Sequence, residues 1–90
     1  MATRQSVDEH LQRSEQVYEF ASEQFKISAR QEHYNEEEYS EAQMKLENAV
    51  NELNKLSLSS NDQQREQLYR MRLQIQSLQN NMILQRSYDE

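Results

Sequence analysis

Apolar residues recur along the chain at alternating steps of four and three positions, the spacing that places side chains along one side of an α-helix. The first of these apolar series contains Val7, Leu11, Ser14, Tyr18, Ala21, Phe25 and Ser28. The second contains Tyr39, Ala42, Leu46, Ala49, Leu53 and Leu56, and the third contains Leu68, Met71, Ile75, Leu78 and Met82. The pattern predicts helices at about residues 6–33, 36–56 and 61–87.

Residues that commonly cap helices stand between the series. Ser6 opens a Ser-x-x-Glu sequence before the first series, which is a capping box and predicts a helix start near Ser6. The segment from Leu56 to Asp62 is rich in serine and asparagine, which favour caps over helix interiors. We therefore predict that Ser59 or Ser60 caps the third helix.

The segment around Asn35 decides the architecture. The first two series share one heptad phase, so a single helix from Ser6 to Leu56, covered by a second copy, is one reading. However, Asn35 is followed by three glutamates, which is typical of a helix start. We predict a turn at Asn35 and one all-α domain, a three-helix antiparallel bundle. A long helical hairpin that forms a coiled-coil dimer is the alternative.

The short connection between the second and third helices predicts an antiparallel hairpin. Folding about its middle brings Ala49 near Leu68 and Tyr39 near Leu78. The same register places two ion pairs across the hairpin, Arg65 with Glu52 and Arg70 with Glu47. Residues 35–60 contain six acids and two lysines, whereas residues 61–90 contain four arginines and four acids, so the charges also favour the pairing.

Composition narrows the class of protein. The 90 residues include no glycine, proline, cysteine or tryptophan, which disfavours folds rich in tight turns. The absence of cysteine also excludes disulfides and thiolate metal sites, and it favours a cytoplasmic protein. The longest apolar run is Met82-Ile83-Leu84, which cannot span a membrane, and a net charge of −6 disfavours nucleic-acid binding.

Candidate sites for chemistry are few. His33 stands near Glu36, Glu37 and Glu38, but consecutive helical positions diverge and cannot converge on one metal ion. No nucleophile turn or paired-carboxylate cleft is indicated. We expect no catalytic residues, no metal, no cofactor, no small-molecule substrate and no enzymatic activity.

Several apolar residues lie outside the three series, and the candidates for a partner-binding face among them are Phe20, Ile27, Leu73 and Ile83. A helix in a bundle touches two neighbours, so some of these residues can belong to a wide core stripe. Any surplus on the surface marks a contact face for another protein or for a second copy of the chain. We therefore interpret the chain as a protein–protein interaction or regulatory module, with a self-assembling structural coiled-coil dimer as the alternative.

Three stretches extend this interpretation: MATRQSVDEHLQR, RQEHYNEEEYSEAQ and NDQQREQLYRMRLQIQSLQNNMIL. Together they cover most of the chain, and they resemble the YtzC-like family of small proteins from Bacillus-type Firmicutes. The family is a domain of unknown function. The resemblance implies a bacterial cytoplasmic setting and supplies no catalytic or binding residues.

Overall fold

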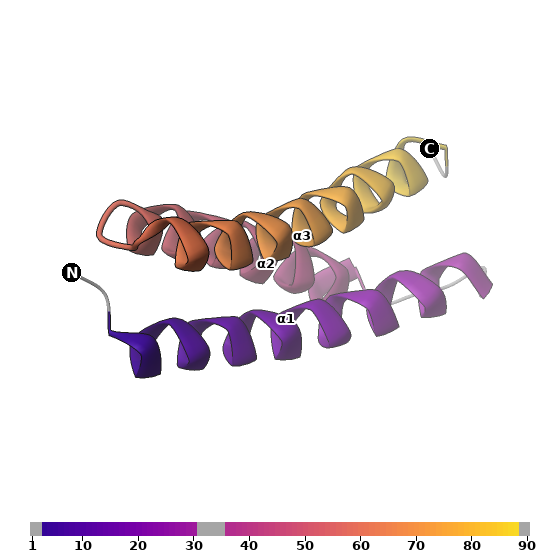
Figure 1. Ribbon diagram of the computed structural model, residues 1–90. Coiled ribbons are helices and arrows are strands. Elements are labelled where there is room, and N and C mark those ends of the chain that lie inside the picture. Colours follow the sequence, from indigo (N-terminus) through magenta and orange to yellow (C-terminus); the bar gives the residue numbers. More distant parts are fainter. Residues whose placement is uncertain (1–2, 31–35, 89–90) are drawn as a thin grey trace.

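Three α-helices make up the described part of the chain, which comprises residues 3–30 and 36–88, with side chains described as far as Gln85. In the computed structural model, α1 spans Arg4–Arg30, α2 spans Glu36–Ser57 and α3 spans Asp62–Tyr88. Each helix contacts the other two, and successive helices run in opposite directions (Figure 1). The predicted all-α, three-helix antiparallel bundle is confirmed.

The alternative of one uninterrupted helix from Ser6 to Leu56 is wrong, because α1 and α2 are separate helices that pack against each other. The predicted cap at Asn35 lies outside the described residues. Glu36, Glu37 and Glu38 form the first turn of α2, where their carboxylates complement the positive end of the helix dipole. The apolar series of α1 and α2 are thus covered within one chain, whereas the long-helix alternative needed a second copy to cover them.

Helix α1 begins at Arg4, earlier than predicted, because Thr3 rather than Ser6 caps it. The backbone amide of Ser6 donates to Oγ1 of Thr3 at 3.0 Å, and the amide of Val7 donates to the Thr3 carbonyl oxygen at 3.1 Å. A threonine at this position satisfies amides that the helix itself leaves without acceptors. Ser6 lies within the first turn, where its carbonyl oxygen is 2.8 Å from Nδ1 of His10.

Helix α3 begins with a capping box at Asn61, directly after the two serines predicted to cap it. The amide of Gln64 donates to Oδ1 of Asn61 at 2.9 Å, and the amide of Asn61 donates to Oε1 of Gln64 at 3.0 Å. This reciprocal pair satisfies two amides at once. Ser60 is buried, and its hydroxyl donates to the Leu56 carbonyl oxygen at 2.6 Å, so it closes α2 instead.

The core lies between the three helices and is built from the predicted apolar series. Among the described residues, Val50 is the only buried apolar residue from outside those series. Full burial of a valine, leucine, isoleucine or methionine side chain stabilises a fold by roughly 1.5–3 kcal/mol. The largest fully buried side chains belong mainly to α2 and α3, namely Tyr39, Leu46, Leu53, Leu68, Ile75, Met82 and, on α1, Val7.

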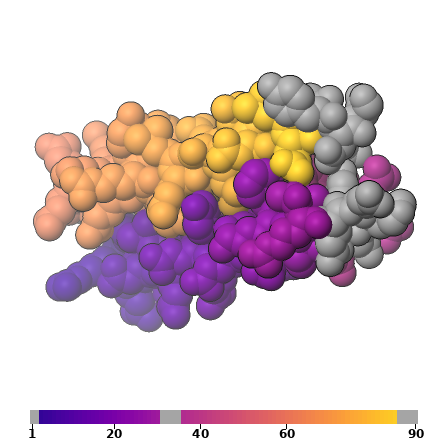
Figure 2. Space-filling model, turned by 90° about the vertical axis from the view of Figure 1, so that its right-hand side faces the viewer, coloured from indigo at the N-terminus to yellow at the C-terminus, as the bar shows by residue number. Residues whose placement is uncertain are grey.

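Helix α1 meets the hairpin of α2 and α3 with small side chains. Its four buried residues recur every seven positions: Val7, Ser14, Ala21 and Ser28. The distance between packed helices depends on the side chains at their contact, so small residues permit a close approach. Figure 2 shows α1 and α3 lying side by side along the length of the molecule. Larger residues beside this line, such as Phe25, then reach the core from the flank.

Two contacts across the hairpin reach further along α3 than the predicted pairings. The buried hydroxyl of Tyr39 donates to the carbonyl oxygen of Met82 at 2.6 Å, one turn beyond the predicted neighbour Leu78. Nε2 of Gln79 donates to Oε2 of Glu47 at 3.0 Å. The turn occupies residues 58–61, so its midpoint lies one residue later than that of the predicted pairings.

The two predicted ion pairs across the hairpin are also wrong. Nε of Arg65 donates to the carbonyl oxygen of Ser57 at 3.0 Å. Nη2 of Arg70 pairs with Oε1 of Glu66 at 2.7 Å, one turn earlier in the same helix. Both arginines therefore find partners closer in sequence than the acids of α2 that the prediction assigned to them.

Candidate interaction surface

One side of α3 carries exposed apolar residues. Tyr69, Leu73 and Ile83 are 50%, 46% and 56% exposed. With the exposed residues Gln76 and Asn80 they recur at steps of four and three, so the five side chains lie along one side of the helix. We call these five residues the α3 outer face. Leu84, which is 47% exposed, lies beside Ile83 at its end.

The α3 outer face points away from the core. Leu73 is two residues from the buried side chains of Met71 and Ile75, and two residues correspond to about 200° around a helix. Helix α3 is therefore apolar on two opposite sides. Helices α1 and α2 cover only the side that carries Met71 and Ile75. Exposed apolar patches of this kind commonly mark sites of protein–protein contact.

The four residues predicted to bind a partner separate into two pairs. On α1, Phe20 is half-buried, packs against the core and has Nζ of Lys45 at 4.7 Å from its ring centroid. Ile27, seven residues later on the same side of α1, is also half-buried. The structure therefore places Phe20 beside α2, whereas Leu73 and Ile83 lie on the outside of α3. The four residues do not form one patch, and a partner-binding role remains a prediction for each.

Tyr69 and Leu84 belong to this surface but were not among the predicted partner-binding residues. The spacing rule that identifies the core series also contains the missing signal. Tyr69 stands four positions before Leu73, and the same steps continue through Gln76 and Asn80 to Ile83. Because the two central positions are polar, an apolar count along the chain does not detect the series.

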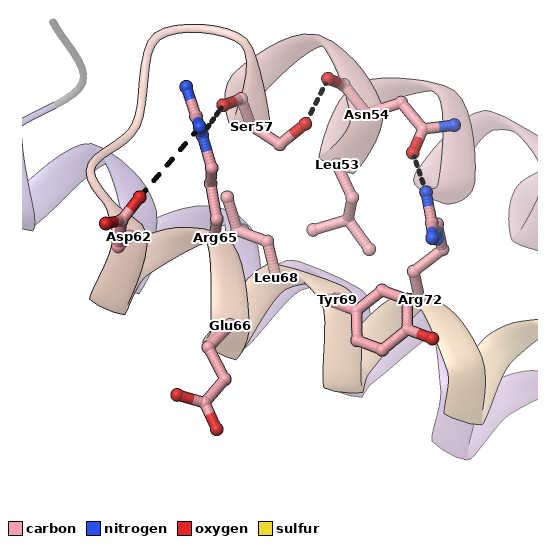
Figure 3. Close-up of a pocket in the computed structure, with 9 residues that line it drawn as sticks. All are labelled: Leu53, Asn54, Ser57, Asp62, Arg65, Glu66, Leu68, Tyr69 and Arg72. Carbon is pink, nitrogen blue, oxygen red and sulfur yellow. Dashed lines mark hydrogen bonds and ion pairs between the residues drawn. The ribbon is translucent and has the colours of Figure 1, made fainter.

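A shallow groove of about 390 Å³ lies next to the face, between α2 and α3 near their turn (Figure 3). Nη1 of Arg72 donates to Oδ1 of Asn54 at 2.8 Å, and its guanidinium lies 5.0 Å from the ring centroid of Tyr69. Arg65 reaches the Ser57 carbonyl oxygen from the same helix as Arg72. The polar groups of the groove are thus largely engaged in joining α2 to α3.

Arg72 has one atom that these contacts leave unsatisfied. Within the described part of the chain, Nε of Arg72 is buried and has no hydrogen-bond partner. An unpaired buried donor costs about 1–3 kcal/mol, and more when the group is charged. The contact between the guanidinium and Tyr69 compensates part of this cost. The position of Tyr69, at one end of the α3 outer face, is therefore linked to the packing of the hairpin.

The described residues show neither a metal-binding cluster nor a membrane-spanning helix. Across residues 3–30 and 36–88, no group of three or more histidine, cysteine, aspartate or glutamate side chains is arranged to hold a metal ion. Glu36, Glu37 and Glu38 are exposed at the start of α2, and His33 lies outside the described residues. None of the helices, as far as they are described, is long and apolar enough to cross a membrane.

These features define a small all-α bundle whose third helix presents a second apolar side at the surface. The chain belongs to the family described as "Protein of unknown function (DUF2524)", which matches residues 1–84. It is 75% identical over 89 residues to "Uncharacterized protein YtzC" of Bacillus subtilis (strain 168), and the match covers 99% of each chain. The resemblance to the YtzC-like family is thereby confirmed. No solved structure matches the chain.

Proposed function

We propose that this protein is a non-catalytic interaction module that binds a protein partner through the α3 outer face. The observation that carries the proposal is the exposure of Leu73 and Ile83 on α3, with Leu73 on the side opposite the buried Met71 and Ile75. A helix face with apolar side chains at steps of four and three is suited to lie against another helix. Tyr69 adds an aromatic side chain, a residue type enriched where protein surfaces meet.

Electrostatics also favour α3 as the binding helix. Helix α2 carries six acidic residues and two lysines, whereas α3 carries four arginines and two acidic residues. Between positions 73 and 85 the sequence contains no charged residue. Desolvation of charged side chains opposes association, so an uncharged stretch is the part of an acidic protein that can be covered at least cost.

The proposal includes the absence of catalysis and a cytoplasmic setting. Arg65 and Arg72, which line the groove beside Tyr69, are engaged with the α2 backbone and Asn54, and this supports a structural rather than a catalytic role for both. The lack of cysteine favours a reducing compartment. The alternative function, a structural dimer built on a continuous first helix, has lost its basis because α1 and α2 are separate helices.

Site-specific photo-crosslinking in living cells tests the proposal. A benzoyl-phenylalanine residue replaces Leu73 in one strain and Leu58 in another, with the protein at its native level. Leu58 is 82% exposed in the turn between α2 and α3, so it is a matched apolar control away from the face. We expect defined protein adducts from position 73 that position 58 does not give. Equal adducts from both positions, or none from position 73, would contradict the proposal.

A further inference from the structure

We propose that the α3 outer face binds the α3 outer face of a second copy of this chain, with the two helices antiparallel. This inference rests on the proposed function, because it names the occupant of the same surface. The grounds are the order of side chains along the face, the distribution of charge between the helices, and the pairing that the chain makes with itself in one register.

The order of side chains restricts which helix fits. Gln76 and Asn80 stand in the middle of the face, with Leu73 before them and Ile83 after them. An occupant that offered only apolar side chains would remove the two amides from water without replacing their hydrogen bonds, which weakens association. The fitting occupant therefore presents polar groups at its centre and apolar groups towards both ends.

Helix α3 itself meets this requirement when it is turned end to end. With Leu73 of one copy opposite Ile83 of the other, Gln76 lies opposite Asn80. Each amide side chain carries both donors and an acceptor, so this pair can exchange hydrogen bonds reciprocally. A shift of one heptad in either direction places Leu73 opposite Gln76, or Ile83 opposite Asn80, and pairs apolar groups with amides. The matched register also obeys two-fold symmetry, so each contact occurs twice.

Charge favours the central segment of α3 as the part of the chain that a second copy can cover. Two copies, each with a net charge of −6, repel one another in general, but α3 has four arginines against two acids. The central segment of α3 has no charged residue at positions 73–85. An antiparallel arrangement separates the Arg65–Arg72 segments of the two copies, although it brings position 86 of each copy opposite position 70 of the other, whereas a parallel one would place the two segments side by side. It also opposes the two helix dipoles.

The size of the contact indicates its strength. Positions 73–83 span about 15 Å of helix, at 1.5 Å per residue. One pair of helices over this length buries less than the roughly 800 Å² per partner of a standard stable interface. We therefore expect a reversible dimer with a dissociation constant on the order of micromolar, rather than an obligate one.

The chain contains no cysteine, so single cysteines report on the register directly. Leu73→Cys, carrying a tag that shifts its mobility on a gel, is mixed with untagged Ile83→Cys and treated with a short bis-maleimide. We expect the mixed dimer to exceed either homodimer by about tenfold, since only the mixed pair is opposed in this register. The pairing of Leu58→Cys with Ile83→Cys is the control, and we expect only background cross-linking from it.

The second measurement compares the sedimentation of the wild-type chain with that of two variants that carry an added charge. Leu73→Glu is expected to raise the dimer dissociation constant at least about tenfold, because the new carboxylate would be covered without a partner. Leu58→Glu makes the same chemical change outside the face and is expected to leave the constant within about twofold. Circular dichroism of both variants confirms that each remains helical.

Three outcomes would overturn the inference. They are a wild-type chain that stays monomeric up to about millimolar concentration, an equal loss of dimer in both glutamate variants, and a predominance of Leu73–Leu73 homodimers, which indicates parallel helices. The proposed function fails separately. If photo-crosslinking at position 73 yields a different protein while the purified chain is monomeric, the interaction face stands and the self-pairing does not.

Discussion

Phe20 on α1 and Leu73 on α3 are alike in sequence and differ in structure. Each is a large apolar residue outside the apolar series of its helix. Phe20 is half-buried and packs against the core beneath the ammonium group of Lys45. Leu73 is 46% exposed on a side of α3 that no other described element covers. The positions of the neighbouring helices therefore decide whether an apolar residue outside the core series is buried or exposed.

The difference in burial between Phe20 and Leu73 follows from how α1 and α3 pack against their neighbours. Helix α1 meets the hairpin through small residues such as Ser14 and Ala21, so it approaches closely and its flanks reach α2. The ammonium group of Lys45 then lies over the Phe20 ring, 4.7 Å from its centroid. On α3 the second apolar side is about 200° from the buried one, too far around the helix for α1 or α2 to reach.

The close seating of α1 is the condition on which this comparison depends most. Ala21 is fully buried, and replacing it with leucine should overpack the contact and lower the free energy of unfolding by about 2 kcal/mol. Ala29→Leu, at an exposed position of the same helix, is expected to change it by less than about 0.5 kcal/mol. Urea unfolding followed by circular dichroism measures both. Equal effects would mean that α1 is not held by its line of small residues.

Truncation of the two compared residues tests the comparison itself. Phe20→Ala should lower the free energy of unfolding by about 1.5 kcal/mol, less than a fully buried phenylalanine loses, because the ring is half-buried. Leu73→Ala should cost less than about 0.5 kcal/mol in the monomer. Thermal unfolding at low protein concentration provides the measurement. A larger loss for Leu73→Ala than for Phe20→Ala would reverse the assignment.

Two tyrosine substitutions test the two sides of α3, because Tyr39 of α2 contacts its inner side and Tyr69 lies on its outer side. The hydroxyl of Tyr39 donates to the carbonyl oxygen of Met82 inside the bundle, so Tyr39→Phe should cost about 1 kcal/mol of unfolding free energy. Tyr69 is half-exposed, and Tyr69→Phe is expected to be within about 0.3 kcal/mol of the wild type. Urea titration of the pair decides the matter, and a neutral Tyr39→Phe would show that this hydrogen bond does not hold α2 against α3.

The smallest expected effect is the coupling between Lys45 and Phe20. A double-mutant cycle with Lys45→Met and Phe20→Leu should give a coupling energy of about 0.5 kcal/mol, the value for a cation near an aromatic ring at a partly exposed site. Urea unfolding of the four proteins measures it. If the coupling energy is indistinguishable from zero, the contact between Lys45 and the Phe20 ring does not stabilise the fold.

The sequence predicted the helices and the core well because helical periodicity depends only on local spacing. It misplaced the caps because adjacent cap residues compete. Ser6 opens an apparent capping box, yet Thr3 stands one turn earlier and caps α1. Likewise Asn61 caps α3 in preference to the two serines before it. Which of several good caps begins a helix depends on where tertiary packing starts the helix, and local spacing does not contain that information.

The sequence alone could not predict how α2 pairs with α3, or which apolar residues outside the core series stay exposed. Complementary charges suggested Arg70 with Glu47, but an arginine finds any acid within its reach, and Glu66 is one turn away in its own helix. Periodicity did identify Phe20 and Leu73 as surplus apolar residues. It did not show that Phe20 would pack beside α2 while Leu73 stayed outside. That distinction requires the relative placement of three helices.

Thiol labelling of single cysteines tests the central claim, the contrast between a seated α1 and an open α3 outer face, most directly. Leu73→Cys and Ala21→Cys are labelled at a protein concentration where the chain sediments as a monomer, and each rate is divided by the rate in urea. We expect Leu73→Cys to react within about threefold of its unfolded rate and Ala21→Cys to be slowed at least about 100-fold, since its exposure requires α1 to detach. Equal protection at the two positions would contradict the account.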